Sequence, residues 1–66
     1  METVGYIVSK SNIKTYEVKW DSETLFVWLD TKPISEGFEK IGSNCINKSI
    51  ALIFAQKFVN NRESRF

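Results

Sequence analysis

The chain has 66 residues, of which 42% are hydrophobic and 26% are charged, and its net charge is +1. This length permits one small domain over residues 1–66, and the near-zero charge gives no general attraction to nucleic acid or membrane surfaces. The single cysteine, Cys45, and the absence of histidine exclude an internal disulfide, a zinc site of the cysteine–histidine type and a base that titrates near neutral pH. We therefore expect no metal, no cofactor and no enzymatic activity.

The sequence also predicts where the protein resides. No stretch reaches the roughly 18 apolar residues of a membrane span. The N-terminal stretch METVGYIVSK lacks the basic start and apolar run of a signal peptide. An unpaired cysteine without an export signal is typical of cytoplasmic proteins. We expect a cytoplasmic protein with no membrane contact.

Two strands are expected in the first part of the chain. Residues 5–10 form a short strand in which Tyr6 and Val8 share one face. Residues 9–12 then supply turn-forming side chains. Residues 13–20 alternate cleanly between apolar and polar side chains, which is typical of a strand buried on one side. The apolar side of this second strand consists of Tyr16, Val18 and Trp20.

A tight turn over residues 21–24 is expected to lead into a third strand, residues 25–30. If the hairpin loop has two residues, Asp21 pairs with Thr24 and the register follows. This register places six apolar residues on the core face, in the pairs Trp20–Leu25, Val18–Val27 and Tyr16–Leu29. The opposite face then holds the pairs Lys19–Phe26, Glu17–Trp28 and Thr15–Asp30.

The second half is expected to form a loop, a strand and a helix. Residues 31–37 contain proline and glycine and read as a loop, and residues 38–44 form a strand with Ile41 pointing inward. Asn47 can cap a helix that runs to about residue 62, although residues 61–66 are expected to fray. Helical spacing gathers an apolar arc from Ala51, Leu52, Phe54, Ala55, Phe58 and Val59.

These elements predict an α+β fold. We expect an antiparallel β-meander of three to four strands, with one C-terminal helix packed across one face of the sheet. The apolar arc of the helix lies on the face that carries Tyr16, Val18 and Trp20, and the small side chains of Ala51 and Ala55 allow a close approach. A single helix covers a single face, so the other face is left open.

The open face carries the strongest functional signal, because Phe26 and Trp28 point out of it. Two such rings present roughly 300–400 Å² of apolar surface, a patch size that ordinary monomers also reach. Three interpretations remain open: the N-terminal arm or the following loop covers the rings, a second copy or another protein binds them, or unpaired bases stack on them. Lys19 favours bases, whereas Glu17 and Asp30 oppose a phosphate backbone.

Charge is unevenly distributed along the chain. Residues 17–39 contain six acidic residues and two lysines, a net charge of −4, whereas residues 40–66 contain five basic residues and one glutamate, a net charge of +4. This fits either an acidic hairpin face with a basic helix or chance in a short chain. The basic residues that such a helix would offer to nucleic acid are Lys48, Lys57, Arg62 and Arg65.

The segment IGSNCINKSIALIFAQKFV resembles the C-terminal half of a double-stranded RNA-binding domain. In that family a strand leads through a glycine-containing loop into a helix that opens with Ser-Lys-Lys and carries alanines about four residues apart. Here residues 47–49 occupy the helix start, and Ala51 and Ala55 match the alanines. The resemblance implies a βββα topology, with Lys48 and Lys57 as the residues that would meet phosphate.

This sequence departs from the family at three places. The family's first helix is replaced by a strand over residues 5–10, its paired lysines are reduced to Lys48, and its histidine-bearing hairpin loop is replaced by the acidic residues 21–24. The resemblance therefore implies the topology more strongly than the RNA binding.

Cys45 and Ile53 each allow a structural and a functional interpretation. Cys45 lies close to the expected helix start, which could lower its pKa, but no histidine is present to activate it. A half-buried structural thiol is the simpler interpretation. Ile53 falls among polar residues on the far side of the helix and, together with Ile50, could seed a helix–helix contact across a dimer.

We predict a non-enzymatic module that works through contacts with another polypeptide. Its binding surface is the open sheet face, with Phe26 and Trp28 as anchors and Lys19, Glu17 and Asp30 on the polar rim. Homodimerisation is the simplest version, since an isologous contact needs only one self-complementary patch. The alternative is an RNA-binding domain that uses the basic helix.

Overall fold

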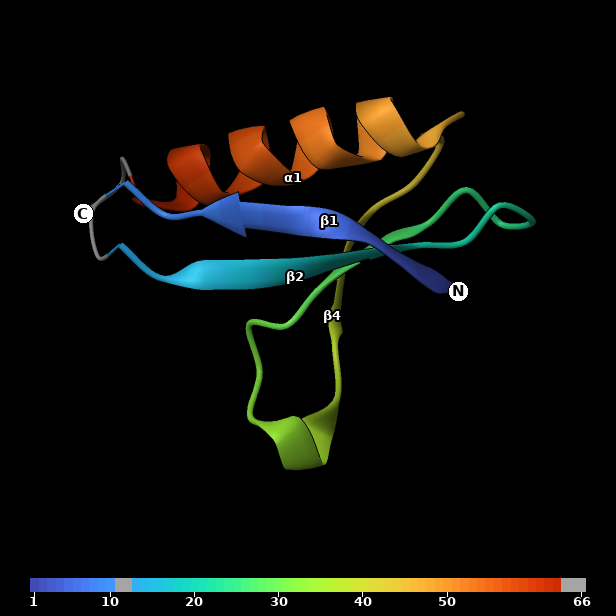
Figure 1. The fold of residues 1–66 in the computed structure, drawn as a ribbon. Coiled ribbons are helices and arrows are strands. Elements are labelled where there is room, and N and C mark those ends of the chain that lie inside the picture. The colour runs from blue at the N-terminus through green and yellow to red at the C-terminus, as the bar shows by residue number, and fades with distance from the viewer. Residues whose placement is uncertain (11–12, 64–66) are drawn as a thin grey trace.

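The computed structural model describes residues 1–10 and 13–63, which form one sheet and one long helix (Figure 1). The strands pair antiparallel in chain order, β1-β2-β3-β4. The α+β meander with a single C-terminal helix across one sheet face is thereby confirmed. The bounds are β1 Glu2–Val8, β2 Thr15–Trp20, β3 Val27–Leu29, β4 Glu39–Gly42 and α1 Lys48–Glu63.

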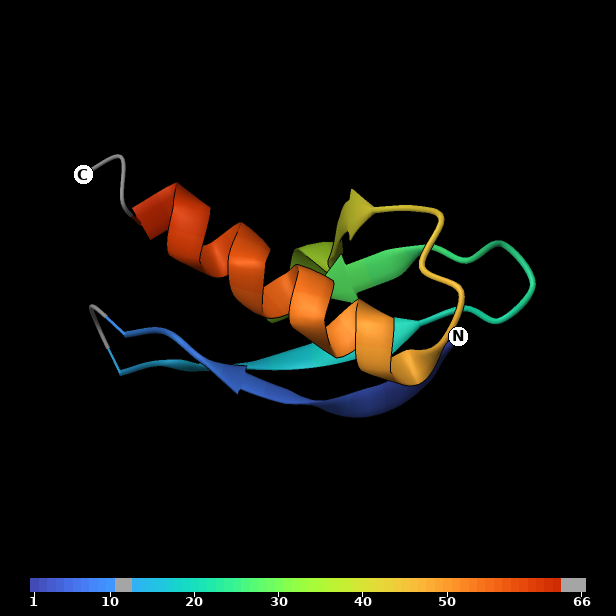
Figure 2. The ribbon, with the colours of Figure 1, turned by 90° about the horizontal axis from the view of Figure 1, so that it is seen from above.

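The core lies between α1 and the sheet face beneath it. Figure 2 shows α1 running obliquely over that face, and its apolar arc is the predicted one. Ala51 and Ala55 are completely buried, so the helix axis lies close to the strands. The Trp20 indole Nε1 donates to the Cys45 carbonyl at 2.8 Å and ties the segment before α1 to β2. The buried apolar residues are Ile7, Val18, Trp20, Val27, Leu29, Cys45, Ala51, Ala55 and Val59.

The helix begins where the sequence predicts. The Asn47 Oδ1 atom accepts a hydrogen bond from the Ile50 backbone N–H at 2.8 Å, which satisfies one of the unpaired donors of the first turn. At the other end α1 continues to Glu63, three residues into the tail expected to fray. Residues 11–12 of the expected first turn and residues 64–66 of that tail lie outside the described residues.

The connection between β2 and β3 differs from the expected two-residue turn. Trp20 pairs with Val27 and Val18 with Leu29, so the expected core pairs are wrong by a displacement of two residues. Leu25 has a φ of 63°, in the left-handed region that a leucine rarely adopts. Its N–H donates to the Asp21 carbonyl at 2.8 Å and its carbonyl accepts from the Cys45 N–H at 3.2 Å. The chain therefore forms a wide loop over residues 21–26.

Because the displacement is an even number of residues, every side chain keeps its expected face. Val18, Trp20, Val27 and Leu29 face α1, and Trp28 faces the opposite side. The other bounds differ slightly from the predicted ones. The first strand starts at Glu2 and ends at Val8, and the expected loop contains a single 3-10 turn, Ile34–Glu36. Ile41 packs against the core from β4, as predicted.

Candidate interaction surface

The sheet face turned away from α1 carries three aromatic side chains, Phe26, Trp28 and Phe38, which we call the aromatic cluster. Trp28 lies in β3, Phe26 immediately precedes that strand, and Phe38 immediately precedes β4. The rings of Phe26 and Trp28 meet edge to face, with centroids 6.5 Å apart and an interplanar angle of 69°. All three side chains are half-buried, so the cluster forms a packed but partly accessible apolar patch.

Two lysines lie against the aromatic cluster. The Lys40 Nζ atom is 3.5 Å from the centroid of the Phe26 ring, and the Lys19 Nζ atom is 4.5 Å from that of Phe38. Both lysines are cross-strand neighbours of Trp28, from β2 on one side and β4 on the other. An ammonium group over a ring face is attracted by the ring quadrupole, by about 0.5–1 kcal/mol at a partly exposed site. The chain therefore covers part of its own aromatic cluster with its own cations.

The Trp28 indole N–H is buried and has no hydrogen-bond acceptor among the described residues. A buried donor without an acceptor costs about 1–3 kcal/mol relative to a satisfied one. Trp20, on the other sheet face, satisfies its equivalent N–H with the Cys45 carbonyl. The aromatic cluster therefore contains an unsatisfied indole donor, whereas the indole donor of the core beneath α1 is satisfied.

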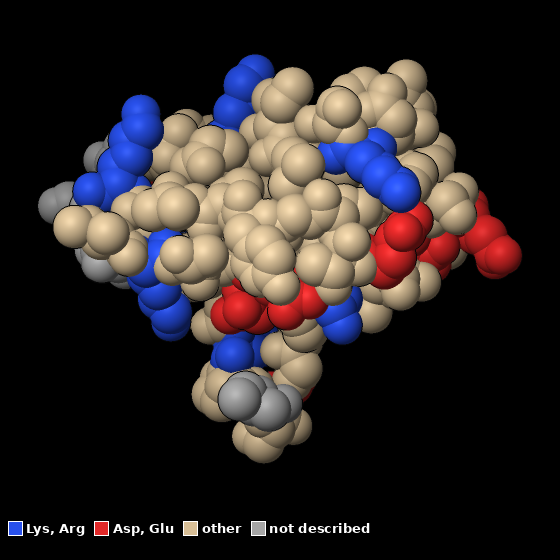
Figure 3. Space-filling model, in the orientation of Figure 1, with Lys and Arg blue, Asp and Glu red and all other residues tan. Residues whose placement is uncertain are grey.

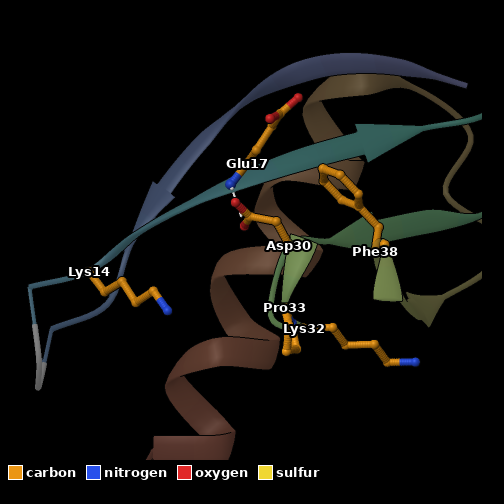
Figure 4. A pocket seen from close by; sticks show the side chains of 7 residues that line it. Lys14, Glu17, Asp30, Lys32, Pro33 and Phe38 are labelled. Carbon is orange, nitrogen blue, oxygen red and sulfur yellow. Dashed lines mark hydrogen bonds between the residues drawn. The ribbon is translucent and has the colours of Figure 1, made fainter. Parts of the chain in front are cut away.

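A hollow of about 440 Å³ lies beside the aromatic cluster (Figure 4). Its walls come from the approach to β2, from β2 itself, from the residues after β3, and from the loop that leads to β4. In Figure 1 this loop projects away from the helix side of the sheet, so the hollow opens on the same face as the aromatic rings. The lining residues are Lys14, Glu17, Asp30, Lys32, Pro33, Gly37 and Phe38.

The two carboxylates of the hollow already accept hydrogen bonds from the chain. The Asp30 Oδ1 atom accepts from the Glu17 backbone N–H at 2.7 Å, in place of a backbone partner at the end of β3. The Glu17 carboxylate accepts from the Thr3 hydroxyl of β1. These contacts hold the carboxylates against the sheet, while Lys19 and Lys40 stand over the rings.

The structure brings the predicted surface residues together with two changes of partners. Lys19 lies opposite Trp28 rather than Phe26, and Glu17 contacts Asp30 rather than Trp28, because of the register displacement. Sequence reasoning missed Phe38 and Lys40. Their alternation with Glu39 and Ile41 was the available signal, since it puts them on the outer face of a strand next to β3.

The cations predicted for nucleic acid occupy different environments. Lys48 forms an ion pair with Glu2 at 3.5 Å, and Arg62 bonds both carboxylate oxygens of Glu39, at 3.2 and 3.0 Å. Lys57 is exposed on α1. Arg65 lies outside the described residues. Two of the helix cations are thus already engaged by carboxylates of the same chain.

The Arg62–Glu39 pair gives a prediction about pH. The Arg62 guanidinium and the Thr31 hydroxyl hold the pKa of Glu39 below its ordinary value. A depressed folded pKa stabilises the fold above the unfolded pKa of about 4.3, and this stabilisation is lost as the pH falls through the folded pKa. Both side chains are partly exposed, so the loss should stay below about 1 kcal/mol.

Urea denaturation near pH 7 and near pH 3 checks this prediction, with Glu39→Gln as the matched control. The other carboxyl groups titrate in both proteins, so the difference between the two isolates Glu39. The wild type should lose more stability on acidification than Glu39→Gln. An equal loss would show that the ion pair contributes nothing to folding.

Cys45 is a core residue rather than a reactive one. Its side chain is 2% exposed, and burial raises the pKa of the thiol. The hypothesis that the nearby helix start lowers this pKa is therefore not supported. A protonated, buried thiol is a poor nucleophile. Cys45 contributes to packing and, through its backbone, to the contacts with Trp20 and Leu25.

Comparisons with known proteins give no relative: no protein family model, curated protein or solved structure matches the chain. The order of three antiparallel strands and a helix, β2-β3-β4-α1, is compatible with the βββα half of a double-stranded RNA-binding domain in topology alone. Within residues 1–10 and 13–63, no three cysteine, aspartate or glutamate side chains gather as metal ligands. In the same ranges, no helix is long and apolar enough to cross a membrane.

Proposed function

We propose that the protein is a non-enzymatic, cytoplasmic interaction module and that its outer sheet face binds another polypeptide. The aromatic cluster beside a hollow, on the face that α1 does not cover, is the observation that carries this proposal. Aromatic anchors surrounded by polar groups are the usual composition of a binding hot spot. The unsatisfied Trp28 N–H adds a donor that a backbone carbonyl of a bound polypeptide could satisfy after a small rearrangement.

The charges of this face favour a polypeptide segment that combines an apolar side chain with acidic residues. Four lysines, Lys14, Lys19, Lys32 and Lys40, surround the rings and the hollow, against the two carboxylates of Glu17 and Asp30. Both carboxylates accept hydrogen bonds from the chain itself. The face thus has an excess of positive charge, which an acidic segment complements.

Base stacking fits this surface less well. A stacked base needs an open ring face, but ammonium groups stand over Phe26 and Phe38. The lining of the hollow includes two carboxylates, which repel phosphate. The helix offers an alternative phosphate surface, but Lys48 and Arg62 are paired with carboxylates. These observations support the polypeptide over the nucleic acid.

Selection from a random peptide library tests the proposal. Wild-type protein should enrich peptides with an acidic residue near an aromatic or aliphatic one. The double variant Phe26→Ala, Trp28→Ala should bind the enriched peptides at least about tenfold more weakly, because each anchor of a hot spot contributes about 1–2 kcal/mol or more. Fluorescence anisotropy of labelled peptides provides the measurement.

Ile46→Ala, Ile53→Ala is the matched control, since it removes two exposed apolar side chains elsewhere on the surface. It should leave peptide affinity unchanged. An equal loss in both double variants would contradict the assignment of the outer face. Titration with single-stranded and duplex RNA at low and moderate salt tests the alternative function, and tight, salt-dependent RNA binding without peptide binding would replace the present proposal.

The sequence also predicts a second copy as the partner on this face, and sedimentation velocity checks that version separately. If the aromatic cluster forms a homodimer contact, Phe26→Ala, Trp28→Ala should run as a monomer at concentrations where the wild type dimerises. A dimer that survives this double substitution must use another surface.

A further inference from the structure

Strand β1 forms one edge of the sheet, and β2 is its only neighbouring strand in the part of the chain that the structure describes. The Ser9 N–H donates to the Lys14 carbonyl at 2.8 Å, so the residues of β1 that bond to β2 alternate from Ser9 through Ile7 to Gly5. The backbone groups of Tyr6 and Val8 therefore point away from β2, toward the open edge. The Val8 carbonyl confirms this direction, because it accepts a hydrogen bond from the Gln56 side chain of α1 at 3.1 Å.

The edge lacks the charges that usually prevent strands from pairing with one another. Between Glu2 and Val8 the strand contains no lysine, arginine or proline. Tyr6 and Val8 are 65% and 49% exposed. Figure 3 shows a broad uncharged band across β1 and α1 on this side, with acidic and basic residues mainly around it. Among the described residues, the edge is protected by the Gln56 amide, which occupies the Val8 carbonyl, and by a bulge between Thr3 and Gly5.

The helix above the edge continues the uncharged surface. Leu52 packs over Gly5 and Gln56 bonds to Val8, so this flank of α1 lies along β1. Ile53 lies one turn before Gln56 on the same flank and is 56% exposed. The edge strand and the helix flank together form one uncharged surface, with the backbone groups of Tyr6 and the N–H of Val8 at its centre.

We infer that this edge pairs with the same edge of a second copy, as antiparallel β1 strands related by a two-fold axis at Tyr6. Antiparallel pairing is self-complementary, because the two Tyr6 residues exchange N–H···O=C bonds with each other. The same register brings Lys10 of each copy toward the Glu2–Lys48 ion pair of the other, past the bulge between Thr3 and Gly5. No like charges meet near the axis, which makes a second copy a suitable occupant.

The resulting dimer contains one continuous eight-stranded sheet. The two-fold axis is perpendicular to the sheet, so both helices lie on one side and both aromatic clusters on the other. The contact is short and falls in the size range of weak, transient interfaces. We therefore expect a monomer–dimer equilibrium between about 10 μM and 1 mM protein. This inference uses the backbone edge of β1 rather than the aromatic cluster, although Tyr6 is the cross-strand neighbour of Glu17 in the hollow.

Sedimentation equilibrium of wild type and Tyr6→Lys across that concentration range tests the inference. Tyr6 is exposed, so the substitution should leave the monomer folded, but it places two lysines directly across the axis. The dimer dissociation constant should rise by about tenfold or more. Ser43→Lys adds the same charge at an exposed residue beyond β4, the opposite edge, and should not change the constant.

Oxidative cross-linking tests the register directly. Hydrogen-bonded antiparallel partners have Cα atoms about 5.5 Å apart, a separation that a disulfide accommodates. Tyr6→Cys should form a covalent dimer rapidly under mild oxidation. Wild type and Thr24→Cys should not, because Cys45 is buried and Thr24 lies in the exposed β2–β3 loop. Wild type that remains monomeric throughout, or a dimer that Tyr6→Lys leaves intact and Phe26→Ala, Trp28→Ala abolishes, overturns the inference.

Discussion

Replacement of Leu29 by alanine is expected to remove about 2–5 kcal/mol from the free energy of unfolding. Leu29 is the largest of the fully buried side chains, and it lies in β3 within the core beneath α1. A domain of this length is expected to have a stability of about 3–10 kcal/mol. The loss is therefore a large share of the total stability. Urea denaturation followed by circular dichroism gives the measurement.

Ile53→Ala is the appropriate control for Leu29→Ala. It removes a similar aliphatic side chain from a position that is 56% exposed, and alanine is the better helix former. Its stability should lie within about 0.5 kcal/mol of wild type. A loss below about 1 kcal/mol for Leu29→Ala would show that β3 is not buried between its neighbours and α1.

Gly42→Ala is the second substitution expected to have a large effect. A Cβ atom at residue 42 would lie 2.3 Å from Cε1 of Phe54 and 2.5 Å from Cζ. The Phe54 ring packs against the core, so it has to shift or β4 has to move away from α1. Overpacking of this kind costs about 1–3 kcal/mol, despite the entropic benefit of replacing a glycine in a strand.

A double-mutant cycle with Phe54→Leu separates the clash from other effects of alanine. Shortening the Phe54 side chain should make room for the Cβ atom, so Gly42→Ala should cost less in that background. Gly5→Ala serves as a comparison, because its Cβ would lie 2.8 Å from a methyl carbon of Leu52, which is more easily displaced. If Gly42→Ala costs the same with leucine at position 54, close packing is not the reason for glycine here.

The most predictable property of this fold was the sheet face on which each side chain lies. Alternation along residues 15–20 assigns Val18 and Trp20 to one face, and the expected pairing assigns Val27 and Leu29 to the same face. The structure confirms these faces. Register was not predictable, because it depends on the backbone of Leu25, whose left-handed conformation is a property that leucine does not signal. Tertiary contacts from the segment before α1, including the Cys45 N–H, favour that conformation.

The candidate surface was only partly predictable for a similar reason. Phe26 and Trp28 belong to the same expected strand, so the sequence predicts that they share a face. Phe38 and Lys40 reach that face only through the pairing of β3 with β4. The hollow depends on where the chain runs between those strands, and no local pattern gives that path. The carboxylate partners of Lys48 and Arg62 come from β1 and β4, far away in sequence, so these ion pairs could not be predicted from a local pattern.

The two tryptophans occupy opposite sides of one thin sheet. Trp20 is 7% exposed beneath α1, with its N–H bonded to a carbonyl, and Trp28 is half-buried on the outer side, with its N–H unsatisfied. The variant Trp20→Phe would therefore keep only the outer indole as a source of tryptophan emission, and Trp28→Phe would keep only the inner one. In a titration, the emission of Trp28 would report on ligand binding at the outer face. The emission of Trp20 would report on unfolding of the core.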